Sequence, residues 1–234
     1  MQTGPRYPAF LLGVKSAVPI VIGYIPLGFA YGVLARQAGL SVMKATAMSL
    51  AVYAGSAQFI AVEMLANGGT AAAIVSTTLL VNLRHLLFSA SLVPYFRRLS
   101  SLALAFLSFG ITDETYAVGI GQYSSCEPQG LQVFGLHLVA YLSWVMSSFT
   151  GAAAGALIGD GSKLGLDFAL PAMFIALVIP QIKNGTALFV AIISGLIAVG
   201  FALSDWSAWS VILATLISAT VGVLVEQWTG RHLP

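Results

Sequence analysis

The sequence predicts an all-α integral membrane protein, a polytopic bundle of about seven or eight hydrophobic segments. Hydrophobic residues make up 58% of the chain and charged residues only 8%, whereas ordinary soluble domains carry about 25% charged residues. Apolar runs near the ~20 residues that a membrane-spanning helix needs recur from one end of the sequence to the other. The loops between them are short, so we expect residues 1–234 to form a single transmembrane domain.

Eight apolar runs can be marked along the chain, and the sixth of them is short. Because that run ends at Pro180, seven full spans are the alternative. We expect the first run to be retained and not cleaved as a signal peptide, because Lys15 and two prolines interrupt it. The runs lie at residues 10–35, 42–66, 71–95, 99–121, 131–158, 167–182, 185–203 and 207–227.

The first run is expected to be a broken or re-entrant segment. Pro19 and Pro26 each remove a backbone donor, and glycines accompany them. A second interrupted stretch, residues 171–180, begins and ends with proline in the other half of the chain. Matching interruptions in two halves indicate an inverted repeat around a central binding site. The proline spacings differ, however, and two ordinary proline kinks would look the same.

Basic residues in short loops give an expected orientation. Arg36 and Lys44 flank the first connection, and Arg97 and Arg98 lie in the third, so both connections are predicted to be cytoplasmic. Simple alternation then places residues 67–69 outside. It also places the N-terminus outside, where its basic residues fit poorly unless the first run is re-entrant.

The first polar string within an apolar run is Tyr53–Phe59. Tyr53, Ser56 and Gln58 offer hydroxyl and amide groups, which predicts a substrate-binding site. The alternative is close helix packing through small residues with hydrogen bonds between helices. Gln58 favours a site, because a primary amide inside a membrane needs several partners.

The second string holds Asn82, Arg84 and His85 within the run at 71–95. An unpaired Arg in hydrocarbon costs at least ~2.5–3.5 kcal/mol, so it usually faces a bundle interior or watery cavity and has a partner. Arg84 could bind a carboxylate, and His85 could exchange a proton near neutral pH. Alternatively, Arg84 extends to the cytoplasmic surface and His85 only packs.

The third string, Thr112–Glu114, carries two carboxylates in the next run. Asp113 and Glu114 are adjacent, so they point in different directions from a helix. One is expected to pair with Arg84, while the other faces a cavity and exchanges a proton. A solvated loop that interrupts the run is the alternative. Buried charges of both signs on successive segments favour a transport pathway over a passive anchor.

The sequence gives no evidence for an enzyme, a metal-binding protein or a nucleic-acid-binding protein. The sequence has no metalloprotease, nucleophile-elbow or phosphate-loop motif and no Cys/His cluster, so we expect no enzyme, metal or cofactor. A net charge of +2 does not indicate nucleic-acid binding. The single cysteine, Cys126, lies in a polar loop and has no intrachain partner for a disulfide. Interfacial or lipid-facing positions are expected for Trp144, Trp206, Trp209 and Trp228.

The ordered polar strings resemble the AzlC family, the large subunit of bacterial branched-chain amino acid exporters. The likeness covers nearly the whole chain and rests on several strings in the family's order. They are Gly13–Pro19, Gly23–Gly32, Tyr53–Phe59, Asn82–His85, Thr112–Glu114 and Leu170–Phe174.

The resemblance implies a multi-pass protein of the bacterial cytoplasmic membrane that exports neutral amino acids with a small hydrophobic AzlD-type membrane subunit. Tyr24, in the first run, joins the candidate substrate-binding residues Tyr53, Ser56, Gln58, Asn82 and Arg84. Proton coupling or charge pairing is expected of His85, Asp113 and Glu114. The alternatives are a channel, or an accessory subunit in which the charges only hold a partner helix.

Overall fold

The computed structural model confirms an all-helical membrane protein. It describes residues 7–97, 99–123, 128–158, 165–179, 182, 184–204 and 210–229, and no strand occurs among them. The chain divides into two units, residues 1–173 and 174–234, each of which is described by itself. Expectations for Arg98, Cys126, Pro180, Trp206 and Trp209 fall outside the described residues.

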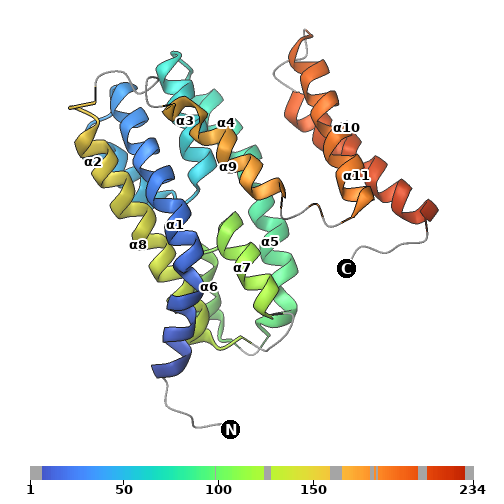
Figure 1. The fold of residues 1–234 in the computed structure, drawn as a ribbon, viewed down its shortest axis with the longest axis horizontal. Helices are drawn as coiled ribbons and strands as arrows, with labels where there is room; N and C mark the ends of the chain where they lie inside the picture. The colour runs from blue at the N-terminus through green and yellow to red at the C-terminus, as the bar shows by residue number, and fades with distance from the viewer. Residues whose placement is uncertain are drawn as a thin grey trace. The chain divides into compact units, whose positions relative to one another are not determined.

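The helices follow the predicted runs closely (Figure 1). Side-chain caps from Ser41, Thr70 and Ser100 begin three of them. The first unit contains α1 (Tyr7–Gln37), α2 (Val42–Ala51), α3 (Gly55–Ala66), α4 (Ala71–Asn82), α5 (Arg84–Leu92), η1 (Val93–Tyr95), α6 (Ser101–Phe109), α7 (Asp113–Tyr123), α8 (Gly130–Ala154) and η3 (Leu166–Phe168). After them come α9 (Ala169–Val178), α10 (Gly185–Ala202) and α11 (Ser210–Thr229).

Helices α1 and α8 run parallel and in direct contact over most of their length (Figure 1). Gly13 lies against the backbone of Gln132 near the start of both helices, and Gly32 lies against Ser148 and Gly151 near their ends. A side chain at either glycine would overlap the neighbouring backbone. Small residues therefore set the distance between the two helices, as is typical of helix pairs in membranes.

The predicted break in the first run is wrong. Helix α1 is continuous through Pro19 and Pro26. Each proline removes one hydrogen bond, but membrane helices tolerate this loss where neighbouring helices hold the backbone. The long contact with α8 supplies that support on one side of α1.

The run at 42–66 is a re-entrant hairpin and not a crossing. Tyr31 of α1 donates a hydrogen bond to the carbonyl of Ala45 in α2 (3.1 Å) and lies 5.9 Å from the ring of Phe59 in α3. Gln58 of α3 donates to Ser49 of α2 (2.9 Å). Residues of α2 therefore lie beside residues of α3 at the same levels, which requires the chain to turn back at residues 52–54.

The run at 99–121 forms a second hairpin from the opposite end. Glu114 near the start of α7 contacts Tyr24, while Gln122 near its end contacts Ser16. Helix α7 thus runs antiparallel to α1. The α7 end also returns to the level where α6 begins, since Tyr123 packs on Phe96 at 5.4 Å.

The two hairpin tips, residues 52–54 and 110–112, meet beside the midpoint of α1. Tyr24 is the eighteenth of the 31 residues of this helix, which is about 46 Å long. Its ring lies 6.3 Å from that of Tyr53, and its hydroxyl lies 2.9 Å from that of Thr112. Both tips therefore lie near the middle of the membrane.

The expected orientation, with Arg36 and Arg97 at one surface and residues 67–69 at the other, is wrong. The end of α1 at Gln37 lies beside the end of α3 at Ala66, so residues 67–69 share one membrane surface with Arg36 and Lys44. We call this surface the Gln37 end. Arg97 lies at the opposite surface, the Arg97 end, because α4 and α5 cross the membrane in between. Both surfaces carry basic residues, so charge alone does not decide which one is cytoplasmic.

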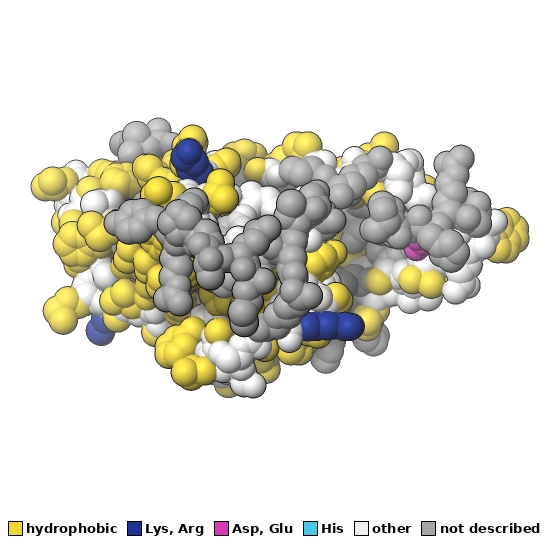
Figure 2. Space-filling view, turned by 90° about the horizontal axis from the view of Figure 1, so that it is seen from below, with side chains coloured by type: hydrophobic (Ala, Val, Ile, Leu, Met, Phe, Trp, Pro, Cys, Tyr) yellow, Lys and Arg dark blue, Asp and Glu magenta, His cyan; other side chains and the backbone are white. Residues whose placement is uncertain are grey.

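Three stretches in the described residues are long and apolar enough to cross a membrane: 9–37, 71–95 and 130–154. Their outer faces carry large apolar side chains such as Ile22, Leu87 and Met146, which are 67%, 72% and 59% exposed. Such side chains suit contact with lipid. In the view of Figure 2, hydrophobic side chains and a few Lys or Arg side chains are visible around the parts drawn in grey.

The second unit contains the pair α10 and α11. The two helices pack directly, and Gly222 of α11 approaches Val190 of α10 so closely that an added Cβ would lie 3.2 Å from it. Ala214 and Ser218, one turn apart on α11, are buried. An inverted repeat that relates the two halves of the chain stays a prediction.

Stability should depend sharply on which glycine of α1 is enlarged. Gly32→Ala forces a methyl group into the α8 backbone and should cost about 1–3 kcal/mol, the usual range for overpacking. Gly23→Ala is the control, because its Cβ meets nothing within 4 Å. Thermal unfolding of both purified variants in detergent provides the measurement. Equal melting temperatures would contradict the close α1–α8 contact.

Candidate functional site

An ion pair joins two elements of the first unit at the level of the hairpin tips. Arg84 Nη2, at the start of α5, lies 2.8 Å from Asp113 Oδ2 in the first turn of α7. Arg84 also donates a hydrogen bond to Ser56 in the first turn of α3. The side chains are 23% and 16% exposed, so the pair is mostly buried. The sequence predicts that Arg84 pairs with one of the two carboxylates. In the structure this pairing is present, with Asp113 as the partner.

Glu114 occupies a separate cluster around α1. The Tyr24 hydroxyl donates a hydrogen bond of 2.7 Å to Glu114 Oε2 and lies 2.9 Å from Thr112 Oγ1. Since the single hydroxyl proton of Tyr24 goes to Glu114, Thr112 acts as the donor to Tyr24. The adjacent carboxylates thus have different partners, a guanidinium for Asp113 and a phenol for Glu114.

The local sequence explains why α7 begins where it does. Thr112 Oγ1 accepts from the Thr115 amide (3.3 Å), and Thr115 Oγ1 accepts from the Thr112 amide (2.8 Å). This reciprocal pair satisfies free backbone donors of the first turn, as a capping box does. Asp113 and Glu114 then lie at the positive end of the helix dipole, which stabilises their negative charge.

The other converging helix start has a different character. Helix α3 begins at Gly55, and its N-cap residue Ala54 makes no side-chain cap. The N-terminal amides of α3 therefore form an electropositive end without a carboxylate of their own, next to Ser56 and Arg84. Helix starts of this kind at mid-membrane bind anionic groups in transporters.

Gln58 holds the first hairpin together. It is fully buried, donates to Ser49 and accepts from Trp144 Nε1 at 2.8 Å. Its expected need for several partners is met by the protein itself, so Gln58 has a clear structural role. The interfacial position expected for Trp144 is wrong: this residue is 1% exposed because its indole N–H reaches Gln58. Trp228, in contrast, is 96% exposed.

Aromatic rings enclose the level of the hairpin tips. Tyr53 is 6% exposed and packs edge-on against Tyr141 at 5.1 Å, with Phe109 at 6.2 Å. Tyr24 in turn lies 5.1 Å from the Trp144 ring. Among the described residues, the buried Tyr53 hydroxyl has no hydrogen-bond partner.

Two predicted site residues stay outside these hydrogen-bonded clusters. Asn82 and His85 are both half-buried and lie on either side of Leu83, the residue between α4 and α5. In the described structure, Asn82 Oδ1 and His85 Nε2 have no hydrogen-bond partner. The His85 ring lies 6.0 Å from that of Phe88.

The sequence-based site omitted several residues that the structure places at its centre. Thr112 and Thr115 show the spacing of a capping pair, which is a readable signal. Ser49 and Trp144 had no such signal, because only the hairpin brings Ser49, Gln58 and Trp144 together. In the described chain, no group of His, Cys, Asp or Glu is arranged to hold a metal ion.

The sequence matches known proteins over most or all of its length. A family model described as "AzlC protein" matches residues 19–158, which include both hairpins and the whole candidate site. The Bacillus subtilis branched-chain amino acid transport protein AzlC is 32% identical over 75% of this chain and 68% of its own length. The Escherichia coli inner membrane protein YgaZ is 28% identical over 98% and 96% of the two chains.

An uncharacterized membrane protein of Archaeoglobus fulgidus is 32% identical over 99% of this chain and 100% of its own. No solved structure matches the chain. The family model spans well over half of the sequence, and the relatives align over most or all of their lengths. The chain is therefore a member of the AzlC family of membrane proteins.

Proposed function

We propose that this chain is a secondary transporter that exports branched-chain or similar neutral amino acids from the cell. Its substrates are leucine, isoleucine and valine, with methionine as a further candidate. Export is driven by the proton gradient across the bacterial cytoplasmic membrane. Membership of the AzlC family and the name of the Bacillus relative support amino acid transport.

The observation that carries the proposal is the meeting of two re-entrant hairpins from opposite membrane surfaces. Non-helical backbone at this depth is tolerated only where protein or a watery cavity covers it. Here both tips lie beside Tyr24, and charged residues surround them. A membrane anchor or a packing module has no need of such an arrangement, whereas a transporter needs a central polar site.

The charges at the tips suit a zwitterion. The carboxylate of an amino acid would bind at the α3 start, with Ser56 and Arg84 as further donors. Its ammonium group would bind Glu114, whose present partner, Tyr24, is an uncharged donor that can turn away. The aliphatic side chain would lie among Tyr53, Phe109 and Tyr141.

Exchange of a proton for the amino acid follows if Glu114 binds only one of them at a time. With its proton bound, Glu114 is neutral and no longer attracts an ammonium group. Each hairpin would open the site toward the surface from which it enters, α2–α3 toward the Gln37 end and α6–α7 toward the Arg97 end. Alternation between these openings would move amino acid and proton in opposite directions.

The transporter is proposed to work with a small hydrophobic AzlD-type membrane subunit, as the family resemblance implies. Half-buried polar side chains at mid-membrane support the need for a protein neighbour on the α5 side. Asn82 and His85 are only half-buried there, so part of each polar side chain would face hydrocarbon unless another protein covers it, and such exposure is unfavourable.

Loss of either member of the ion pair should strongly reduce export. Arg84→Gln and Asp113→Asn each leave a mostly buried charge without its ion-pair partner, so we expect at least a tenfold lower rate of export. Radiolabelled leucine efflux from dipeptide-loaded cells, with and without the small subunit, measures this rate. Lys44→Gln is the control, because Lys44 is exposed on α2 at the Gln37 end.

Wild-type export by both ion-pair variants, at normal expression, would contradict the proposal. If the pair served only to hold a partner helix, the double variant would restore complex formation that each single variant had lost. Saturable efflux that stops when the proton gradient is dissipated separates a transporter from a channel, which shows neither property.

Leucine binding should weaken as the pH falls, because a proton on Glu114 competes with the ammonium group. Glu114→Gln should bind leucine weakly at every pH, since its neutral amide neither attracts the ammonium group nor takes up the proton. Binding of labelled leucine to the purified protein over a pH series tests this expectation. Glu226→Gln, a carboxylate change in the second unit, should keep the wild-type pH dependence. A Glu114→Gln variant with unchanged pH dependence would exclude Glu114 as the proton carrier.

A further inference from the structure

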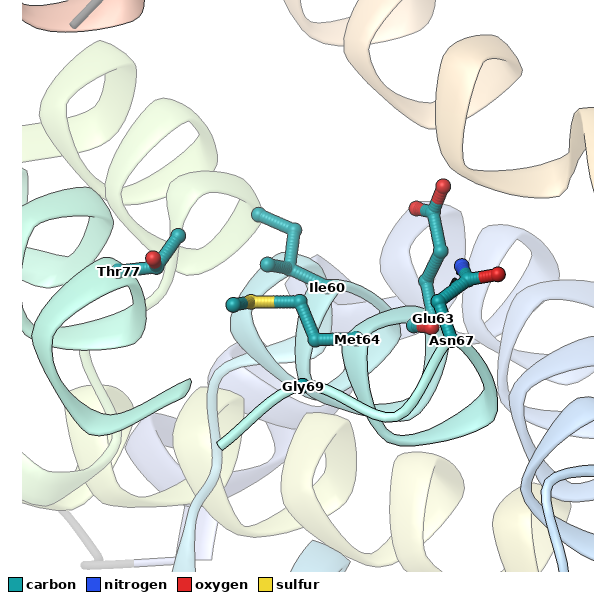
Figure 3. A pocket seen from close by; sticks show the side chains of 6 residues that line it. All are labelled: Ile60, Glu63, Met64, Asn67, Gly69 and Thr77. Atoms are coloured by element: carbon teal, nitrogen blue, oxygen red, sulfur yellow. Dashed lines mark hydrogen bonds between the residues drawn. The ribbon is translucent and has the colours of Figure 1, made fainter. Parts of the chain in front are cut away.

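A groove of about 460 Å³ lies between α3 and α4, near the Gln37 end of the first unit. In Figure 3, Ile60 and Met64 of α3 point toward Thr77 of α4, while Glu63 and Asn67 project on another side of α3. Gly69, in the short connection between the two helices, completes the lining. The volume is in the range of small-molecule sites, about 300–1,000 Å³.

Helical periodicity connects this groove to the candidate site. Ser56, Ile60 and Met64 follow one another at four-residue spacing, so they lie along one face of α3. Thr77 and Arg84 are seven residues apart and share a face of the α4–α5 crossing. Because Arg84 donates a hydrogen bond to Ser56, the two faces that line the groove meet at this bond.

The path from the groove to the site is short. Ile60 is one helical turn from Ser56, a rise of about 6 Å, and Thr77 is two turns from Arg84, a rise of about 10 Å. The α3 face that lines the groove therefore continues from Met64 and Ile60 to Ser56 at the uncapped helix start, beside the ion pair.

The lining residues suit the binding of a neutral amino acid. Ile60 and Met64 form an apolar wall that fits an aliphatic side chain. Glu63 provides the one carboxylate of the lining and is exposed, beside the amide of Asn67. An exposed carboxylate on a membrane helix favours water over lipid in the groove. Glu63 also borders a second groove of about 400 Å³ against α1, so it is accessible from both sides of α3.

We propose that the α3–α4 groove is the vestibule through which the amino acid passes between the Gln37 end and Arg84. Glu63, at the edge of the groove, is the group that holds the ammonium of the amino acid at the entrance of this vestibule, and Ile60 and Met64 contact the aliphatic side chain of the amino acid. This inference rests on the proposed function and adds the route and a first binding position to it.

Cysteine labelling tests the route. The full chain with its small subunit carries Cys126→Ser, which removes the native cysteine, and then Thr77→Cys or Ile60→Cys. Val75→Cys and Leu79→Cys are matched controls at almost the same depth of α4, where the native side chains are 64% and 62% exposed on the apolar surface. A charged, membrane-impermeant thiosulfonate is the probe.

Thr77→Cys and Ile60→Cys should react at least tenfold faster than the two controls, from one membrane surface only, and excess leucine should slow the reaction. Glu63→Gln should raise the KM for leucine efflux severalfold, and Glu63→Asp should restore most of it. Reaction at Thr77→Cys as slow as at Leu79→Cys would overturn the vestibule, as would fast reaction that leucine leaves unchanged.

The failure of the vestibule and the failure of the proposed function give different results. A chain that inserts normally but exports no amino acid rejects the proposed function. If the chain exports leucine but Thr77→Cys does not react, the vestibule alone is rejected. Lipid or the small subunit then covers the groove.

Discussion

The contact between α1 and α8 is the constraint on which the rest of the first unit depends. Gly32 and Gly151 bring the two backbones so close that no side chain fits between them. Both hairpins are then attached to this pair of helices. Tyr141 of α8 donates a hydrogen bond to Leu50 of α2 at 3.0 Å, and Ser16 of α1 bonds with Gln122 of α7 at 2.8 Å. The level at which the tips meet is thereby fixed.

The bilayer explains why so many polar groups at this level have protein partners. An unsatisfied polar group in hydrocarbon costs several kcal/mol, so a broken helix is stable only when side chains or other backbone satisfy it. Gln58 satisfies the indole N–H of another segment, and Thr115 satisfies a backbone amide of its own segment. Neither side chain carries a charge that could bind a substrate, whereas those of Arg84, Asp113 and Glu114 do. Residues that support the site and residues that could bind a ligand are thus separate sets.

Much of the architecture could be predicted from the sequence, because hydrophobic runs determine where helices form in a membrane. All eight predicted runs contain helices at nearly the predicted positions. The direction of each segment could not be predicted in this way. Hydropathy is the same for a crossing of some 25 residues and for a hairpin of two half-length helices. The hairpin at 42–66 is revealed only by contacts such as Gln58 with Ser49.

The site was predicted in part for the same reason. A charge in an apolar run needs a partner, which led from Arg84 to the carboxylates. The choice between Asp113 and Glu114 depends on how α7 is rotated, and no local pattern determines this rotation. The prolines of α1 were misleading, because tertiary contacts with α8 keep the helix continuous where its own sequence favours a break.

The two helix starts at the tips differ in charge, so the electric field at the centre of the first unit has a fixed direction. The start of α3 has no acidic residue in its first turn, whereas the start of α7 has two. The positive side of the centre therefore faces α3, and the negative side belongs to α7. A zwitterion bound between them, as proposed, would be aligned by this field in one direction only. Its two ends would then be distinguished by charge, without any difference in shape.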